Sequence, residues 1–216
     1  MKLLRILLTG FEPFGKYKEN SSWAVAEKVA ACGVVDAEVV AMRLPVSFAG
    51  VGAALHKAVE ECCPDVIIML GQCAGVDYIK LERIAINMMD ATTPDNDGYL
   101  PDEDPICATG AAALFTNTDI KDLRRVVEEQ GIPAKISNSA GLYVCNRTYY
   151  EALRFCNERP GMKALFVHLP LYEGQPSAAE GQPTMPLDDM ARAVETIIHK
   201  INYTDAKIQE TACAHI

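Results

Sequence analysis

Cys145 is the residue of this chain best placed to act as a nucleophile. It follows the Ser/Asn/Gly-containing segment 137–141 and falls in the first turn of an expected helix. The N-terminus of a helix carries about half a positive charge, so this position favours a thiolate and lowers the pKa of the thiol. Backbone N–H groups of the same turn can bind an oxyanion. The alternative is that Cys145 is one more small buried residue of the core.

His168 is the histidine best placed to act as a base. It ends the apolar segment 164–168 (ALFVH), so its ring is expected at the end of a buried strand. Of the other three histidines, His56 and His199 lie in amphipathic helical segments and His215 is near the C-terminus. A cysteine and a histidine at neighbouring strand ends form the nucleophile–base pair that acyl transfer requires. A structural role for His168 remains the alternative.

A carboxylate is the third group that such a pair needs, because it orients the imidazole and stabilises its positive charge. Glu82 lies in the apolar stretch LERIAIN, where a buried carboxylate requires a partner. An ion pair with Arg83 would satisfy it equally well in a purely structural role. Asp90, Asp95 and Asp97 are competing acids, although residues 95–98 (DNDG) have the composition of a turn.

Strand-like and helix-like segments alternate along the whole chain. This pattern predicts a three-layer α/β/α sandwich with a mostly parallel twisted sheet, of the phosphorylase/hydrolase-like type. The expected strands are 3–9, 38–44, 65–70, 78–89 (one strand or a hairpin), 111–116, 134–137 and 164–168. The expected helices are 23–31, 47–62, 119–130, 142–156 and 186–201.

Ligands of open α/β sheets bind beyond the carboxyl ends of the strands. Four loops follow expected strands in this way and should gather along one edge of the sheet: 10–15, 71–76, 138–145 and 168–175. The first loop, GFEPFG, brings two aromatic rings, Phe11 and Phe14, to that edge. They suit a small, flat, neutral ring, or else they pack together as the loop's own core.

Composition and charge limit the class of protein. The 216 residues, 50% hydrophobic and without an internal linker or repeat, indicate one domain spanning 1–216, with a frayed tail from about 203. A net charge of −9 with dispersed Lys and Arg argues against nucleic acid as a partner. No apolar run is long enough for a membrane span. The apolar start is interrupted by Arg5 and ends at Gly10, so it is not read as a signal peptide, and a cytoplasmic location is expected.

The eight cysteines form no C-x-x-C pair and are expected to be reduced thiols rather than disulfides. Cys213 and His215 alone are too few for a metal site, so no metal is expected. Gly-rich phosphate-binding motifs are absent, and no cofactor is expected. The serine-hydrolase motif G-x-S-x-G is also absent.

Seven segments, in order along the chain, match the motifs of one enzyme family. They are LLTGFEPFG, LPVSF, GQCAG, LERIAIN, PDNDGYLP, SNSAGLYVCN and FVHLPLYEGQ. Through them the chain resembles pyroglutamyl-peptidase I (pyrrolidone carboxyl peptidase), a cysteine-type omega peptidase that removes N-terminal pyroglutamate. The resemblance implies a catalytic triad of Glu82, Cys145 and His168, which changes the interpretation of Glu82 from structural to catalytic.

The resemblance also implies which residues form the substrate pocket, and it implies the cofactor requirement, location and oligomeric state of the enzyme. Phe11 and Phe14 would sandwich the pyroglutamyl ring and Gln72 would recognise its amide, with Tyr143 and Val144 as further substrate-binding residues. The family it resembles acts on N-terminally pyroglutamylated peptides without metal or cofactor. Its members are cytosolic and usually homotetrameric.

Two positions depart from the family pattern. Val76 and Thr92 stand where bacterial members commonly carry arginine, and the second of these arginines is associated with stabilising the oxyanion. One oxyanion donor contributes about 2.7–4 kcal/mol, so a slower enzyme is expected. These departures keep open a non-catalytic or altered-specificity member that binds a small ligand. A nucleoside-phosphorylase-like enzyme is a further alternative, although the chain lacks its phosphate-binding elements.

Overall fold

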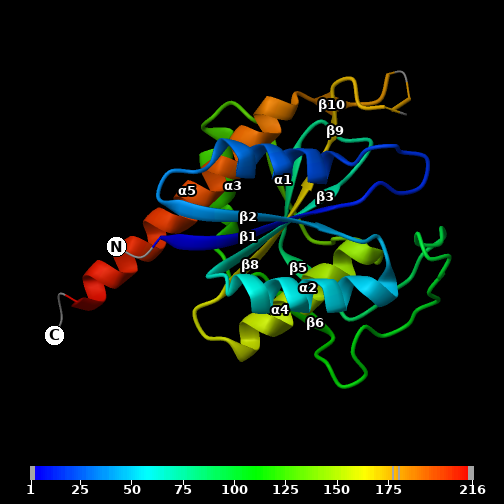
Figure 1. Ribbon diagram of the computed structural model, residues 1–216, viewed down its shortest axis with the longest axis horizontal. Helices are drawn as coiled ribbons and strands as arrows, with labels where there is room; N and C mark the ends of the chain where they lie inside the picture. The colour runs from blue at the N-terminus through cyan, green and yellow to red at the C-terminus, as the bar shows by residue number, and fades with distance from the viewer. Residues whose placement is uncertain (1–2, 177, 180, 214–216) are drawn as a thin grey trace.

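A six-stranded sheet with helices on both faces forms the centre of the molecule (Figure 1). The computed structural model describes residues 3–176, 178–179 and 181–213, with residues 203–213 as backbone only. The strand order is β2-β1-β3-β8-β4-β7. Its strands are β1 (Leu4–Phe11), β2 (Ala37–Leu44), β3 (Val66–Gln72), β4 (Ile79–Glu82), β7 (Ala134–Ser137) and β8 (Lys163–Leu169).

The two helical layers cover opposite faces of this sheet. The helices are α1 (Ser21–Cys32), α2 (Phe48–Cys62), α3 (Ile120–Glu128), α4 (Val144–Glu158) and α5 (Leu187–Cys213). Apolar residues of α1, α3 and α5 form one buried cluster with the sheet, and those of α2 and α4 form another. Alternate side chains of β3 supply the two clusters, Ile68 to the first and Ile67 to the second. A central strand buried on both faces explains the continuous apolar run of its sequence. The predicted three-layer sandwich is confirmed.

The directions of the strands differ from the expectation in one respect. β1, β2, β3 and β8 are parallel, but β4 runs antiparallel to β8, and β7 is parallel to β4. The carboxyl end of β7 therefore points toward the opposite edge from that of β8, and the prediction that all four loops leave strands at one edge is wrong for 138–145. Residues 138–143 turn back after β7, which allows α4 to begin beside the ends of β3 and β8.

The helix starts follow the capping residues of the sequence. The side chain of Asn20 accepts a hydrogen bond from the backbone N–H of Ser22, and that of Ser47 from Gly50. Both bonds satisfy N–H groups that have no partner within the helix. At the other end of the chain, α5 continues to Cys213 instead of ending near Ile201. His215 lies outside the described residues.

The expected strand 78–89 is divided in two. β4 ends at Glu82, and β5 (Ile84–Ile86) pairs with β6 (Ala113–Phe115) in a separate two-stranded sheet. Side chains of α4 hold the break: the hydroxyl of Tyr149 donates to the carbonyl of Glu82, and Asn146 bonds to both the N–H and the carbonyl of Ile86. A third small sheet, β9 (Leu171–Tyr172) with β10 (Thr184–Met185), is too short to have been predicted.

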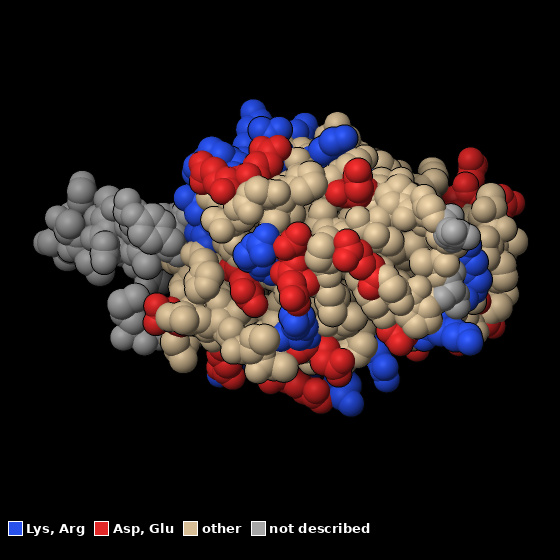
Figure 2. All heavy atoms as spheres, turned by 90° about the horizontal axis from the view of Figure 1, so that it is seen from above, with Lys and Arg blue, Asp and Glu red and all other residues tan. Residues whose placement is uncertain are grey.

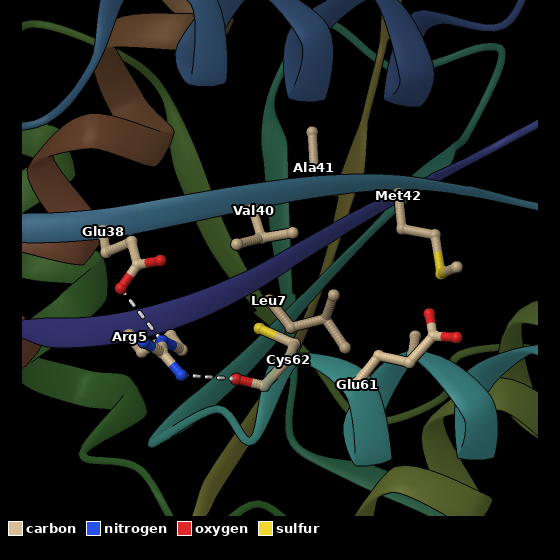
Figure 3. A pocket seen from close by; sticks show the side chains of 9 residues that line it. Arg5, Leu7, Glu38, Val40, Ala41, Met42, Glu61 and Cys62 are labelled. Carbon is tan, nitrogen blue, oxygen red and sulfur yellow. Dashed lines mark hydrogen bonds and ion pairs between the residues drawn. The ribbon is translucent and has the colours of Figure 1, made fainter.

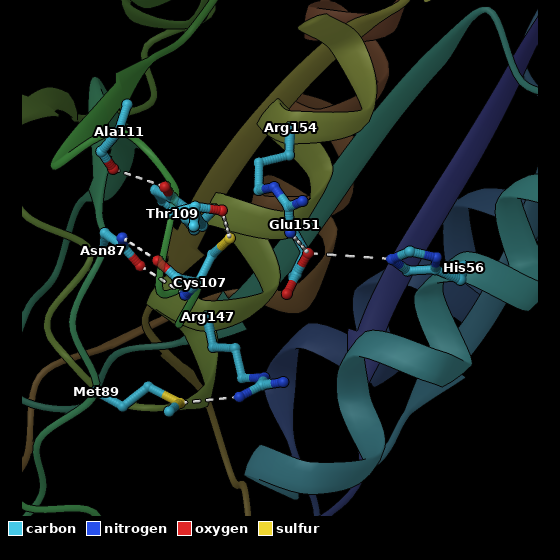
Figure 4. A network of polar contacts seen from close by, with 10 residues as sticks. His56, Asn87, Met89, Cys107, Thr109, Ala111, Arg147, Glu151 and Arg154 are labelled. Atoms are coloured by element: carbon cyan, nitrogen blue, oxygen red, sulfur yellow. Dashed lines mark hydrogen bonds and ion pairs between the residues drawn. The ribbon is translucent and has the colours of Figure 1, made fainter. Parts of the chain in front are cut away.

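Polar contacts tie the long segment between β5 and β6 to α4 (Figure 4). The amide of Asn87 bonds to the backbone of Cys107 at both its oxygen and its nitrogen, and the hydroxyl of Tyr150 donates to the carbonyl of Ala111. These bonds give an irregular segment a fixed course beside the helix that carries Cys145.

The surface mixes charges of both signs. The face seen in Figure 2 carries acidic and basic side chains interspersed among uncharged ones, rather than a continuous basic patch. Within the described part of the chain, no helix combines the length and the apolar character needed to cross a bilayer.

Candidate active site

A cavity of about 200 Å³ lies at the carboxyl ends of β1, β3 and β8. It is lined by Phe11, Phe14, Asn20, Val46, Gln72, Ala140, Tyr143, Val144, Cys145 and His168. All five residues predicted for the substrate pocket are in this wall, as are two of the three predicted catalytic residues. Asn20, Val46 and Ala140 were not predicted. Val46 and Ala140 do lie inside matched motifs, which is the signal that could have found them.

Glu82 does not line the cavity, but its carboxylate is bonded to the imidazole of His168, which does. Its Oε1 lies 2.9 Å from Nδ1 of the imidazole. In the antiparallel pairing of β4 and β8, Lys80 is opposite His168 and Glu82 is opposite Phe166, so Glu82 and His168 are diagonal neighbours on one face of the sheet. The carboxylate thus pairs with the histidine and not with Arg83.

The pair is almost removed from solvent, since Glu82 is 0% and His168 is 8% exposed. Oε2 of Glu82 has no hydrogen-bond partner among the described residues. A buried carboxylate with only one partner is expensive unless that partner carries positive charge. The bond to His168 is therefore the interaction that compensates for the burial of Glu82.

Gly71 makes room for the imidazole. A Cβ atom at this position would lie 2.9 Å from Cδ2 of His168 and 2.8 Å from the ring of Phe166. Such contacts are far inside van der Waals distance, so any larger residue would displace the rings. The glycine of the GQCAG motif is thus required by the close approach of β3 to His168, with which it pairs in the sheet.

Cys145 is the second residue of α4. The N-cap residue Tyr143 makes no side-chain capping bond, so N–H groups of the first turn are left for a ligand. The sulfur and the His168 ring line the same cavity, but no hydrogen bond joins them within the described structure.

The thiol of Cys145 is neutral in the resting site. Burial, and then the charges of Glu82 and Cys73, raise its pKa to about 12. The expectation that the helix start lowers this pKa is therefore wrong for the resting site, because desolvation outweighs the helix terminus. A sulfur in this state needs a base to become a nucleophile.

The aromatic loop is held by a carboxylate and an amide. Oε1 of Glu12 accepts hydrogen bonds from the backbone N–H of Val46 at 3.0 Å and from the side chain of Asn96 at 2.8 Å. The Asn96 amide also donates to the carbonyl of Pro13 at 3.0 Å. These bonds fasten the segment between Phe11 and Phe14 to two other loops.

Asp95 organises the loop that supplies Asn96. Its carboxylate accepts hydrogen bonds from the backbone N–H groups of Phe48, Asp97 and Tyr99, at 2.7, 3.0 and 2.9 Å. The predicted turn at 95–98 is confirmed by the bond from the N–H of Gly98 to the carbonyl of Asp95. Asp95 is therefore occupied with backbone groups and is not a competitor of Glu82.

A second thiol lies near the site. Cys73 follows β3, and the ammonium of Lys80 donates to its sulfur at 3.1 Å. All seven cysteines whose side chains are described are free thiols, as expected. Cys213 lies outside the described side chains. A labelling experiment must therefore distinguish Cys73 from Cys145.

Another hollow, of about 300 Å³, lies between β2 and α2 (Figure 3). Its guanidinium, Arg5, is already bonded to Glu38 and to the carbonyl of Cys62. No histidine faces Cys62 there, and burial raises the pKa of this thiol. This hollow therefore lacks a nucleophile–base pair. No cluster of three or more potential metal ligands occurs among the described residues.

The chain is similar to known proteins over almost its whole length. A sequence profile of the family described as pyroglutamyl peptidase matches residues 4–203. The pyrrolidone-carboxylate peptidase of Clavibacter michiganensis is 38% identical over 205 residues, covering 94% of this chain and 96% of that protein. The pyrrolidone-carboxylate peptidase of Thermococcus onnurineus is 39% identical, covering 90% of this chain and 97% of that protein.

Solved structures show the same similarity. The pyrrolidone carboxyl peptidase from Thermococcus litoralis superposes with a TM-score of 0.89 at 31% identity, covering 94% of this chain and 96% of that one. The pyroglutamyl peptidase I from Bacillus amyloliquefaciens gives a TM-score of 0.84 at 33% identity, covering 90% of this chain and 94% of that one.

Proposed function

Because the chain belongs to the pyroglutamyl peptidase family, we propose that it is a cysteine peptidase that removes N-terminal pyroglutamate from peptides. The observation that carries the proposal is the single cavity shared by Cys145, His168 and the predicted ring-binding residues, with Glu82 bonded to the far side of the imidazole. A nucleophile, a base and an orienting acid are thereby assembled around a space for one small ring.

Acylation begins with His168 as the base. Nδ1–H donates a hydrogen bond to the Glu82 carboxylate and keeps its proton, so Nε2 is the nitrogen available to take the thiol proton from Cys145. The sulfur attacks the carbonyl that joins pyroglutamate to the next residue. The tetrahedral oxyanion binds N–H groups at the start of α4. Glu82 stabilises the imidazolium that forms.

In the second half of the reaction, the proton taken up by His168 is passed on and the acyl group is released. The imidazolium of His168 gives this proton to the leaving amine, and a thioester to Cys145 remains. His168 then takes a proton from water, which attacks the thioester and releases free pyroglutamate. The thiol regains its proton, so the site ends as it began.

The lining of the cavity suits a neutral lactam. Apart from Cys145 and His168, its residues carry no ionisable group other than the Tyr143 phenol, whose pKa burial raises. Phe11 and Phe14 offer apolar walls, Tyr143 and Val144 complete them, and Gln72 offers a hydrogen-bonding amide. The volume corresponds to roughly six or seven waters, which is room for one small ring.

We further propose that the enzyme is one domain that acts in the cytosol as a homotetramer, without metal or cofactor. The family profile spans 4–203, and the described cysteines are free, as in a reducing compartment. Light scattering of the purified protein at micromolar concentration tests the assembly, for which four chains are expected.

The experiment that tests the activity is hydrolysis of a pyroglutamyl amide of a fluorophore, with and without reductant. Cys145→Ala and Cys145→Ser should lower kcat by at least about 10⁴-fold, because they remove the nucleophile. Cys32→Ser, at an exposed thiol, is the matched control and should keep full activity. Turnover that survives in Cys145→Ala would contradict the assignment.

The alternative of a non-catalytic or altered-specificity member rests on Val76 and Thr92. Neither residue lines the cavity, and Thr92 is exposed. A non-catalytic binder would take up free pyroglutamate in calorimetry while the unaltered chain shows no turnover of the fluorogenic amide. An active enzyme would show both.

A further inference from the structure

Gln72 is held from behind by a second glutamine. Its Oε1 accepts a hydrogen bond from the backbone N–H of Ser21 at 2.9 Å and another from Nε2 of Gln175 at 2.7 Å. Gln175 is 3% exposed and does not line the cavity. Its Nε2 also donates to the carbonyl of Glu19 at 3.1 Å, and its Oε1 accepts from the N–H of Tyr172 at 3.2 Å.

The backbone groups around these two amides allow only one orientation of each. A backbone N–H can only donate and a carbonyl can only accept. The N–H of Ser21 therefore requires the oxygen of Gln72, while the N–H of Tyr172 and the carbonyl of Glu19 independently fix Gln175. In these orientations the amide nitrogen of Gln175 faces the amide oxygen of Gln72, as the hydrogen bond between them requires. Neither can be flipped without leaving buried groups unpaired.

The consequence reaches the cavity. With both lone pairs of its oxygen in use, Gln72 has only its NH₂ group to offer a ligand. No hydrogen bond among the described residues uses that nitrogen, and Gln72 is part of the cavity wall. The wall therefore presents a donor at this point and not an acceptor.

We propose that Gln175 is a positioning residue that sets the ring specificity of the site, by holding Gln72 with its amide nitrogen toward the substrate. The ring must then carry a hydrogen-bond acceptor at that place. The lactam carbonyl of pyroglutamate meets this requirement, and the otherwise similar ring of an N-terminal proline does not. This inference rests on the proposed function and extends it from the reaction to the choice of ring.

Two substitutions at Gln175 separate this role from a purely structural one. In Gln175→Glu the new carboxylate keeps the bond from Tyr172 but cannot donate to Gln72 or to the Glu19 carbonyl. It attracts the NH₂ group of Gln72, which turns the Gln72 oxygen toward the cavity. In Gln175→Leu all the bonds are lost, but the N–H of Ser21 still fixes Gln72.

If Gln175 orients the amide of Gln72, Gln175→Glu should impair substrate binding more than Gln175→Leu does. KM for the pyroglutamyl amide should rise by about tenfold or more, whereas Gln175→Leu should raise it by about threefold. In both variants kcat should stay within about threefold, because the contact is made in the ground state as well as in the transition state. A structural role predicts the opposite order, since leucine removes more bonds.

The control is Gln182→Glu, the same replacement in the same segment at a side chain whose one hydrogen bond among the described residues comes from the N–H of Ala179. Its KM should equal that of the unaltered enzyme. A mutant cycle provides the second test and does not depend on the folding of the Glu variant. In a Gln72→Leu background, Gln175→Leu should change KM by less than about twofold, because no amide remains to be oriented.

Equal effects of Glu and Leu at Gln175, or additive effects in the cycle, would overturn the inference while leaving the peptidase intact. If the unaltered enzyme does not cleave the pyroglutamyl amide at all, the proposed function fails instead. Prolyl amide assayed beside the pyroglutamyl amide gives the final readout. The preference for pyroglutamyl over prolyl should fall at least about tenfold in Gln175→Glu and stay unchanged in Gln182→Glu.

Discussion

The two halves of the candidate site are built in opposite ways. In the ring-binding half, paired carboxylates fasten the loops: Glu12 accepts from Val46 and Asn96, and Asp95 accepts from three backbone N–H groups. In the reactive half, one oxygen of Glu82 has no partner, and the sulfur of Cys145 makes no hydrogen bond to the imidazole, within the described structure.

The difference fits the role that we propose for each half during the reaction. A pocket that only recognises a ring performs best when its walls are fixed in advance, because no energy is then spent on ordering them. Groups that exchange protons must change partners at every step, so a fully satisfied resting state would hold them back. The buried carboxylate of Glu82 is unfavourable in the resting enzyme, and a positive charge on His168 during the proposed reaction would offset part of that cost.

The strongest test of this comparison exchanges a carboxylate for an amide in each half. Glu82→Gln should lower kcat by about 10³–10⁴-fold with little change in KM, because the neutral amide neither holds the required tautomer nor stabilises the imidazolium. Glu12→Gln, the matched change in the ring-binding half, should leave kcat within about threefold. Steady-state kinetics on the fluorogenic amide measure both. Similar losses of kcat in the two variants would remove the distinction between the halves.

The pH dependence of alkylation tests the neutral thiol of the resting site. Since the pKa of Cys145 is raised to about 12, the thiolate fraction grows with pH throughout the range below that value. Inactivation by iodoacetamide should therefore accelerate about tenfold per unit between roughly pH 7 and 10. A rate already at its plateau near pH 6 would show instead that Cys145 and His168 form an ion pair at rest.

Substitution of Asp95, which organises the loop of the ring-binding half, should lower the stability of the fold more than it lowers activity. Asp95→Ala leaves the N–H groups of Phe48, Asp97 and Tyr99 without an acceptor, so the free energy of unfolding should fall by about 1–3 kcal/mol. Urea denaturation followed by fluorescence measures it. Asp97→Ala is the control, because Asp97 accepts only the hydroxyl of Ser47 among the described contacts, and its loss should be smaller.

The smallest effect is expected at the neighbouring thiol. Cys73→Ser should keep kcat/KM within about threefold, since Cys73 does not line the cavity. The thiol of Cys73 is partly exposed, so Cys73 should nevertheless react with iodoacetamide. Mass spectrometry of the labelled peptides separates the two thiols. Loss of activity that follows labelling of Cys73 in a Cys145-protected sample would make the two thiols functionally inseparable.

The sequence predicted most of the elements because their signals are local. The apolar run 65–70, the amphipathic pattern 119–130 and the caps Asn20 and Ser47 all correspond to observed elements. The break at Glu82 was missed, since it depends on hydrogen bonds from Tyr149 and Asn146, which lie far along the chain. The antiparallel direction of β4 and β7 was also missed, because it depends on the pairing of β4 with β8, which lies far along the chain.

The sequence alone determined which side chains are available for this chemistry and, through seven ordered motifs, which family the chain belongs to. Only the tertiary structure decided how those side chains are charged and aimed. Burial keeps the Cys145 thiol protonated, His168 rather than Arg83 becomes the partner of Glu82, and Gln175 fixes which atom of Gln72 faces the ring. The physical reason is that residue type and spacing are local, whereas desolvation and hydrogen-bond polarity depend on every group that folding brings around a side chain.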